Sequence, residues 1–206
     1  IESEDNMKPI LFNGESARAI LDGRKTQTRR IAKLPEQWHR GYGSFDETHP
    51  NGREEFVIYG DCGTKTMDCP YGKVGDKLWV REKWRPLYEY CNPNGGIVGA
   101  CFRYMGGGRI FNDKHKNHMH IDDTYNFKPS IHMPKWACRI FLEITDIRVE
   151  RVQDISEADV EAEGILCPGW YSGEFRILWD SINEKRGYGW DVNPYVWVVE
   201  FKRVKN

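Results

Sequence analysis

The sequence lacks several features that would place it in a familiar class. No run approaches 18 uninterrupted apolar residues, so the sequence predicts no membrane-spanning helix and no membrane partner. No charged segment followed by an apolar core resembles a secretory leader, so we expect a cytoplasmic protein. The phosphate-binding patterns GxxxxGK(S/T) and GxGxxG are also missing, which argues against a P-loop or a dinucleotide-binding fold.

Paired cysteines are missing as well. The sequence has six cysteines but no CxxC pair, and without a leader we expect reduced thiols rather than a disulfide framework. The spacing of Cys62 and Cys69 fits no common zinc knuckle. A second group, His115, His118 and His120, lies in a long polar segment without helical spacing. The sequence therefore predicts neither a metal site nor a cofactor.

Excess charge of one sign is also absent, because the formal net charge is −1. This excludes a protein that binds nucleic acid over its whole surface, as histones do. The charge is unevenly distributed, however. Residues 17–40 carry seven basic and two acidic side chains, whereas residues 142–163 carry eight acidic and two basic ones. Screening limits each exposed charge to about 8–10 Å, so the basic segment can still attract phosphate locally. We interpret the acidic segment as a solvated face.

The hydrophobic pattern that is present predicts an α+β fold. We expect strands over residues 8–12, 26–31, 56–59, 77–84, 98–104, 137–152 and 195–204. We expect helices between Asn13 and Gly23, between Ser156 and Gly164, and over residues 174–183. Because strands and helices do not alternate regularly, a parallel doubly wound sheet is disfavoured. A small mixed β-barrel with short peripheral helices fits best.

The chain is expected to form a single domain over residues 7–206. Within it, residues 34–69 and 86–128 are rich in turn-forming and polar residues, and we predict them to be two long loop insertions. Residues 1–6 precede Met7 and are interpreted as a remnant of cloning.

Four blocks of this sequence resemble a known family. They are LDGRKTQTRR at residues 21–30, GDKLWVRE at 75–82, ISEADVEAEGI at 155–165 and YVWVVEF at 195–201. Together they resemble ASCH domains, a branch of the PUA-like superfamily. The further block SIHMPKWA at residues 130–137 resembles the longer ASCH proteins of bacteriophages and prophages. The resemblance implies a PUA-like mixed β pseudo-barrel with a cleft beside the first helix.

The resemblance also implies a site. The superfamily mostly binds RNA or modified nucleosides, and one small bacterial member is an N4-acetylcytidine amidohydrolase that uses a lysine, a threonine and a glutamate. The matching positions here are Lys25, Thr28 and Glu163, with Glu161 as the alternative glutamate. Other members are ribonucleases or binding proteins, so fold membership alone does not settle the chemistry.

These three residue types can do amide chemistry. Partial desolvation would lower the pKa of Lys25 and let it activate a hydroxyl. Thr28 is a poor nucleophile unless such a base is adjacent, and Glu163 could carry a proton to a leaving amine. The plainer interpretation is a surface lysine, a strand threonine and a glutamate at a helix end.

Basic and aromatic residues at strand ends are candidates for nucleic-acid contact. We predict phosphate contacts from Arg30, Arg81 and Lys135, and base stacking on Trp84 and Trp136. Arg30 shares strand parity with Thr28, so we expect it to face the cleft and Arg29 to be an exposed charge. The alternative for both tryptophans is that they brace the barrel rim.

The combined expectation is a protein that binds a single-stranded or modified nucleic acid, or a nucleoside, through a basic and aromatic-lined cleft. The alternative function is an amidohydrolase that acts on N4-acylated cytidine-type substrates. A ribonuclease and a structural or assembly protein are further alternatives.

Overall fold

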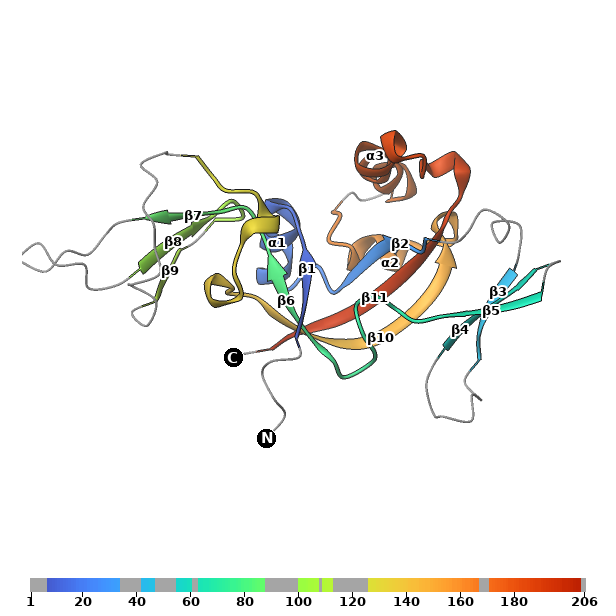
Figure 1. Cartoon of the computed structure of the whole chain (residues 1–206). Helices are drawn as coiled ribbons and strands as arrows, with labels where there is room; N and C mark the ends of the chain where they lie inside the picture. The colour runs from blue at the N-terminus through green and yellow to red at the C-terminus, as the bar shows by residue number, and fades with distance from the viewer. Residues whose placement is uncertain are drawn as a thin grey trace, which may run out of the picture. The chain divides into compact units, whose positions relative to one another are not determined.

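A computed structural model of the whole chain describes residues 7–33, 42–46, 55–60, 63–87, 100–107, 109–112, 126–166 and 171–204 (Figure 1). These residues form an α+β protein with few short helices and open sheets. The strands are β1 (Lys8–Leu11), β2 (Gln27–Ile31), β3 (Tyr42–Asp46), β4 (Glu55–Gly60), β5 (Gly63–Met67), β6 (Lys77–Arg81), β7 (Trp84–Leu87), β8 (Ala100–Tyr104), β9 (Arg109–Asn112), β10 (Phe141–Arg151) and β11 (Tyr195–Val204). The α-helices are α1 (Gly14–Leu21), α2 (Glu157–Ala162) and α3 (Tyr171–Asn183).

Five of the strands form one mixed sheet with the order β1-β6-β10-β11-β2. β1 pairs in parallel with β6, and β11 pairs antiparallel with β2, with Val199 opposite Thr28. The order is linear, with β1 and β2 at its two ends. In the described part of the chain the sheet is open, and the mixed α+β architecture agrees with the predicted fold class.

The segments predicted as loop insertions contain strands. β3, β4 and β5 form an antiparallel sheet inside the first segment. β8 and β9 lie in the second segment and form another sheet with β7, which begins at Trp84, two residues before that segment. Only the strand over residues 56–59 was expected in the first segment and the one over 98–104 in the second. Both segments are rich in glycine and polar residues, so the other strands show little strand pattern in the sequence. These strands are stabilised by pairing with their hairpin neighbours, and the sequence of one strand alone does not reveal that pairing.

The strand predicted over residues 77–84 is interrupted. β6 ends at Arg81, and Trp84 begins β7, where it lies opposite Tyr104 of β8. Between them, the amide of Glu82 donates to the Met133 sulfur over 3.4 Å instead of to a neighbouring strand. Trp84 therefore belongs to a different sheet from β6.

The helix boundaries follow local signals that the sequence shows. The Asn13 side chain accepts a hydrogen bond from the Ser16 amide over 2.8 Å, and Gly23 follows the helix with a φ of 75°. Ser156 and Asp159 form a reciprocal capping box at the start of α2. Both helices lie where the sequence predicts them, whereas α3 begins three residues before the expected position 174.

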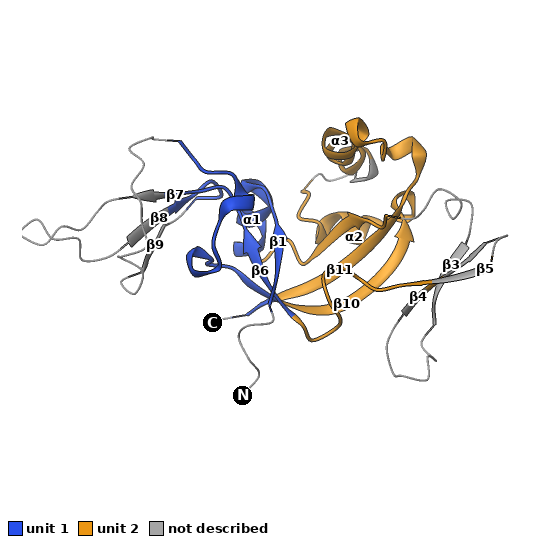
Figure 2. Cartoon of the chain, viewed as in Figure 1, with its two compact units in different colours: residues 1–22, 77–142, 203–206 blue, residues 23–76, 143–202 orange. Residues whose placement is uncertain are grey.

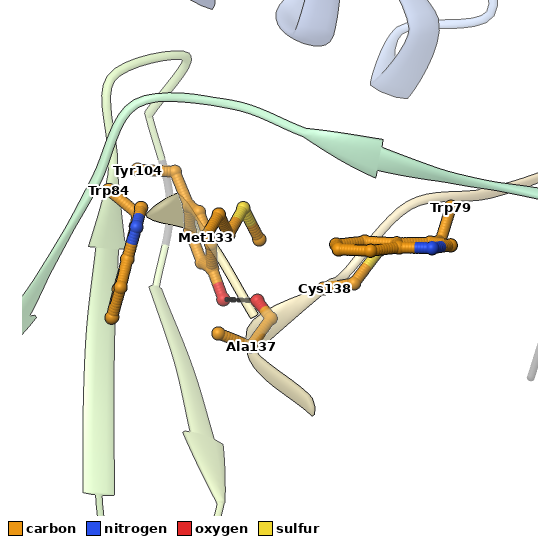
Figure 3. Close-up of a cluster of buried hydrophobic side chains, with 6 residues drawn as sticks. All are labelled: Trp79, Trp84, Tyr104, Met133, Ala137 and Cys138. Carbon is orange, nitrogen blue, oxygen red and sulfur yellow. Dashed lines mark hydrogen bonds between the residues drawn. The ribbon is translucent and has the colours of Figure 1, made fainter. Parts of the chain in front are cut away.

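The described residues gather into two compact units (Figure 2). Unit 1 comprises residues 1–22, 77–142 and 203–206, and unit 2 comprises residues 23–76 and 143–202. The core of unit 1 contains Trp79, Trp84, Tyr104, Met133, Ala137 and Cys138 (Figure 3). The core of unit 2 contains Val152, Val160, Phe175, Trp179, Val196 and Val198.

None of the helices in the described part of the chain has the length and the apolar character needed to cross a membrane.

Candidate functional site

The segment that leads from Gly23 into β2 binds the carboxyl end of α2, and Figure 1 shows these two elements side by side in unit 2. Arg24 donates to the Gly164 carbonyl over 3.3 Å, and Lys25 donates to the Glu163 carbonyl over 2.8 Å. The Thr26 amide donates to the Ala162 carbonyl over 2.9 Å. Carbonyls at a helix end lack partners within the helix, so this segment satisfies them.

Lys25 and Glu163 form a buried ion pair. The Lys25 Nζ atom lies 2.5 Å from Glu163 Oε2, and the two side chains are only 5% and 6% exposed. The other carboxylate oxygen, Oε1, accepts a hydrogen bond from the Arg29 amide over 2.6 Å. Glu161 is exposed, so of the two glutamates considered only Glu163 takes part in this pair. The structure thus brings together two of the three residues predicted to be catalytic.

The environment of Lys25 lowers the pKa of its ammonium group. Burial is the largest cause, and the positive charges of Arg30 and Arg29 act in the same direction. Glu163 opposes the shift through its charge and its hydrogen bond, but it does not cancel it. A lysine in this environment gives up its proton more readily than an exposed one.

Thr28, the third residue of the predicted set, lies on β2 and is 4% exposed. It directly precedes Arg29, whose amide binds Glu163. The peptide bond after Thr28 therefore lies against the Glu163 carboxylate. The three residues are neighbours through this backbone segment and through the Lys25–Glu163 ion pair.

Arg29 is a residue whose placement the sequence prediction got wrong. Strand parity predicted an exposed charge, but the Arg29 side chain is 1% exposed. Its NH2 atom lies 2.9 Å from Glu150 Oε2 and 3.2 Å from Asp159 Oδ2, and its NH1 atom lies 3.8 Å from Glu163 Oε1. Packing of unit 2 around β2 overrides parity, because the side of the strand that carries Arg29 is covered too.

The carboxylates around Arg29 come from the acidic segment that was interpreted as a solvated face. That interpretation is wrong for Glu150, Asp159 and Glu163, which all contact buried cations. The sequence did contain a signal for this arrangement. The basic excess of residues 17–40 and the acidic excess of residues 142–163 have opposite signs, and such segments can pair in the fold.

Arg148 is a second centre of this charged cluster. It lies 2.5 Å from Glu150 and 2.8 Å from Asp159, and it also contacts Glu200. Burial lowers the pKa of Arg148, but the hydrogen bonds to Glu150 and Glu200 outweigh burial and raise it overall. Burial likewise raises the pKa of Asp159, but hydrogen bonds from Ser156 and the charge of Arg29 lower it to about 2.

The predicted nucleic-acid contacts are divided between the two units. Arg30 lies in unit 2, in β2 next to the ion pair, whereas Arg81, Trp84, Lys135 and Trp136 lie in unit 1. The Arg81 guanidinium group stacks on the Trp79 ring, with 4.6 Å to its centroid. Lys135 and Trp136 are half-buried in the short 3₁₀ helix over Lys135–Ala137.

Trp84 has a structural position. It is 6% exposed and belongs to the core cluster of unit 1 in Figure 3, where Tyr104 donates its hydroxyl to the Ala137 carbonyl over 2.7 Å. Its ring also meets Trp136 edge to face, with 6.3 Å between centroids. The arrangement matches the alternative in which Trp84 braces its neighbours.

Unit 1 contains a further buried ion pair that sequence reasoning missed. Glu82 and Arg139 form two parallel hydrogen bonds of 2.7 and 2.9 Å, and the Arg139 guanidinium group stacks 4.1 Å from the Tyr104 ring centroid. The Glu82 side chain is 1% exposed. Its partner is 57 positions away in the sequence, so no local pattern could reveal the pair.

The described residues contain no group of three His, Cys, Asp or Glu side chains that could hold a metal ion. Cys62, His115, His118 and His120 lie outside the described residues. Cys69 and Cys138 form no disulfide in the described part of the chain, and burial raises the pKa of Cys138 to about 11. A thiol with this pKa is a weak nucleophile and a poor metal ligand at neutral pH.

Comparison with known proteins identifies similar folds. The chain is similar to an ASCH domain from Lactobacillus crispatus, with 14% identity and a TM-score of 0.38 over 91% of this chain and 69% of the other. It is also similar to a DUF984 protein from Enterococcus faecalis, with 10% identity and a TM-score of 0.41 over 97% and 82% of the two chains. No protein-family model matches the sequence, and no curated protein matches it significantly. These likenesses concern the fold alone and assign no role to any residue.

Proposed function

We propose that this protein binds a single-stranded or modified nucleic acid, or a nucleoside, and that Lys25 and Glu163 contact the edge of one base. The observation behind the proposal is the buried ion pair, which sets a strong donor 2.5 Å from a strong acceptor. The edge of a nucleobase likewise presents acceptors and donors side by side, and lysine and glutamate are among the side chains that read them.

The Glu163 carboxylate has capacity for such a contact. Among the described residues, Lys25 donates to Oε2 and the Arg29 amide donates to Oε1. A carboxylate oxygen has two lone pairs, so each oxygen can accept one more hydrogen bond. Because the pair is buried, a base that leaves these groups without partners would bind less well by about 1–3 kcal/mol.

The rest of the proposal concerns phosphate and ring contacts. Arg30, Arg81 and Lys135 are half-buried and retain exposed surface for phosphate. Trp136 is also half-buried and supports stacking better than Trp84, whose ring lies in the core. In this proposal Trp84 packs edge to face against Trp136, and each unit contributes its own contacts: Arg30 from unit 2, and Arg81, Lys135 and Trp136 from unit 1.

An amidohydrolase on N4-acylated cytidine is the second candidate, and the lowered pKa of Lys25 favours it. The Thr28 oxygen would add to the acyl carbonyl carbon while its proton passes to the neutral Lys25 amine. Glu163 would relay this proton from Lys25 to the departing exocyclic nitrogen, and the carbon–nitrogen bond would break. Water would then release the acyl group from Thr28 as a carboxylic acid.

Mass spectrometry against a panel of modified nucleosides separates the two candidates. The panel would include cytidine and N4-acetylcytidine, and calorimetry with RNA oligonucleotides that contain the same bases would measure binding. We expect binding without turnover. Release of acetate from N4-acetylcytidine would establish the enzyme instead, and no binding to any of these ligands would contradict both candidates.

Two conservative variants test the roles of the side chains. Lys25→Arg keeps a positive charge that cannot be removed at working pH, and Thr28→Val keeps the shape but deletes the hydroxyl. For a binding protein we expect both variants to retain affinity within roughly tenfold, or about 1.4 kcal/mol. For an amidohydrolase both would abolish turnover. Unchanged turnover in both variants would eliminate the amidohydrolase mechanism.

A further inference from the structure

We propose that Arg29 is a positioning residue that fixes the orientation of the Glu163 carboxylate group towards Lys25. This inference rests on the proposed function for the importance of Glu163, but its structural part can be tested without any ligand. Arg29 was expected to be exposed, and the resemblance to the family gives it no role.

The Arg29 side chain must have a reason to be buried. Arginine does not lose its proton in proteins, so a guanidinium group that is 1% exposed requires carboxylates close by. Glu150 and Asp159 provide them at 2.9 and 3.2 Å. Two nitrogens of the guanidinium group, Nε and NH1, have no hydrogen-bond partner among the described residues, although both are buried. The ion pairs with Glu150 and Asp159 therefore use only part of the hydrogen-bonding capacity of the Arg29 guanidinium group.

The anchors of Arg29 are themselves fixed. Glu150 uses Oε2 for Arg29 and Oε1 for Arg148, and Asp159 uses Oδ2 for Arg29 and Oδ1 for Arg148. Each carboxylate therefore bridges two arginines through different oxygens. These bridges hold the Arg29 guanidinium group independently of Lys25, because neither Glu150 nor Asp159 takes part in the Lys25–Glu163 pair.

Arg29 contacts Glu163 through both its backbone and its side chain. Its amide donates to Oε1 over 2.6 Å, and its NH1 atom lies 3.8 Å from the same oxygen. The longer distance is an electrostatic contact rather than a hydrogen bond. Because both contacts hold Oε1, the other oxygen is the one that faces Lys25 at 2.5 Å.

The direction of the Arg29 amide follows from the position of β2 at the end of the sheet. On the side of β11, the Ala32 amide donates to the Tyr195 carbonyl over 2.9 Å, and residues 27–31 pair in register with β11. The amide of residue 29 lies three positions earlier, so it points to the opposite side, where it meets Glu163. The Arg29 amide is therefore hydrogen-bonded to a side chain, whereas the Ala32 amide is hydrogen-bonded to the backbone of β11.

Hydrogen exchange at these two amides tests the inference. In Arg29→Gln the carboxylate loses the cation that holds Oε1. We expect exchange of the residue 29 amide to speed up at least tenfold more than exchange of the Ala32 amide. Arg29→Lys keeps a charge but not the forked geometry, so we expect a smaller selective increase. If Arg29→Gln does not fold, Arg29→Lys decides, with a threefold selective increase as the criterion.

Arg148→Gln is the matched control, because Arg148 shares the same two carboxylate anchors but does not contact Glu163. It weakens the anchors of Arg29 but leaves the Arg29 guanidinium group in place. We therefore expect it to lower the melting temperature and to give a smaller selective increase at the residue 29 amide than Arg29→Gln does. Equal acceleration of the two amides in both Arg29 variants would overturn the positioning role and leave a purely structural one.

A binding measurement then separates this inference from the proposed function. With an RNA oligonucleotide of about 10 nucleotides as the probe, we expect Arg29→Gln to lose at least tenfold in affinity and Arg148→Gln to stay within threefold. Arg29→Gln affinity equal to that of Arg148→Gln would overturn the functional part of the inference. If the parent protein binds no oligonucleotide or nucleoside, the proposed function fails, while the exchange result still decides whether Arg29 positions Glu163.

Discussion

At the scale of the residue, Lys25 has two roles that the sequence could not separate. It closes the carboxyl end of α2 through the Glu163 carbonyl, and it pairs with the Glu163 carboxylate. The first role is structural and is typical of a cation at a helix end. The second places a buried positive charge next to the buried Glu163 carboxylate. A loss of function in a Lys25 variant therefore needs a stability measurement beside it.

Glu163→Gln tests how strongly Lys25 depends on its partner. Removing one member of a buried ion pair typically costs about 3–5 kcal/mol, so we expect a clear fall in the free energy of unfolding at neutral pH. The control is Glu161→Gln, two residues away and exposed, which should change stability by no more than about 0.5 kcal/mol. Denaturant titration would measure both variants, and equal effects would contradict the buried-pair interpretation.

The same variant has a predictable pH dependence. The pKa of Lys25 is already lowered from 10.5 in the folded protein, and loss of Glu163 removes the main group that opposes this shift. Between the folded and unfolded pKa values the unfolded chain binds more protons, so stability rises with pH. Relative to the parent, Glu163→Gln should recover stability as the pH is raised towards 10.5. Adding Lys25→Met should remove this recovery.

At the scale of the element, local signals predicted helices well and strands less well. The Asn13 cap, Gly23 and the Ser156–Asp159 box are sequence-local, and each appears in the structure as predicted. The break between β6 and β7 depends on Met133, which is 51 positions from Glu82. The burial of Arg29 likewise depends on carboxylates more than 120 positions away. Periodicity within a segment cannot show such contacts.

Helix α2 should also make the protein sensitive to acid. Ser156 hydrogen bonds and the charge of Arg29 lower the pKa of Asp159 to about 2, below its ordinary 3.8. A carboxylate with a depressed pKa contributes stability above pH 4 that is lost as the pH falls towards 2. We therefore expect Asp159→Asn to flatten the decline of the melting temperature over this range. Asp191→Asn, at an exposed carboxylate paired with Arg176, should leave the decline unchanged.

At the scale of the whole molecule, sequence blocks predicted the α+β class and the proximity of Lys25 and Glu163, but not the division into two units. The blocks at residues 21–30 and 155–165 both fall in unit 2, which is why their residues could meet. The block at residues 75–82 crosses from unit 2 into unit 1 at position 77. A motif read along the chain shows which residues belong to a family pattern, but it does not show which compact unit each will join.

The net charge is −1, and a nearly neutral molecule has little long-range attraction for a polyanion. The salt dependence of binding should therefore reflect the number of side chains that contact phosphates directly. Lys25 is buried and paired, so we do not count it among the phosphate contacts. Three residues remain, Arg30, Arg81 and Lys135. At about −0.7 per neutralised phosphate for a single strand, the slope of log K against log salt should be about −2. Titration of an RNA oligonucleotide at several salt concentrations measures it, and Lys135→Ala should reduce the slope by about 0.7.

A slope near zero would mean that the ligand is an uncharged nucleoside. A slope steeper than about −3 would mean that exposed residues of the basic segment, such as Arg18 and Lys33, also bind phosphate. In that case Arg18→Ala would reduce the slope as well, whereas a ligand confined to the three predicted contacts would leave Arg18→Ala without effect.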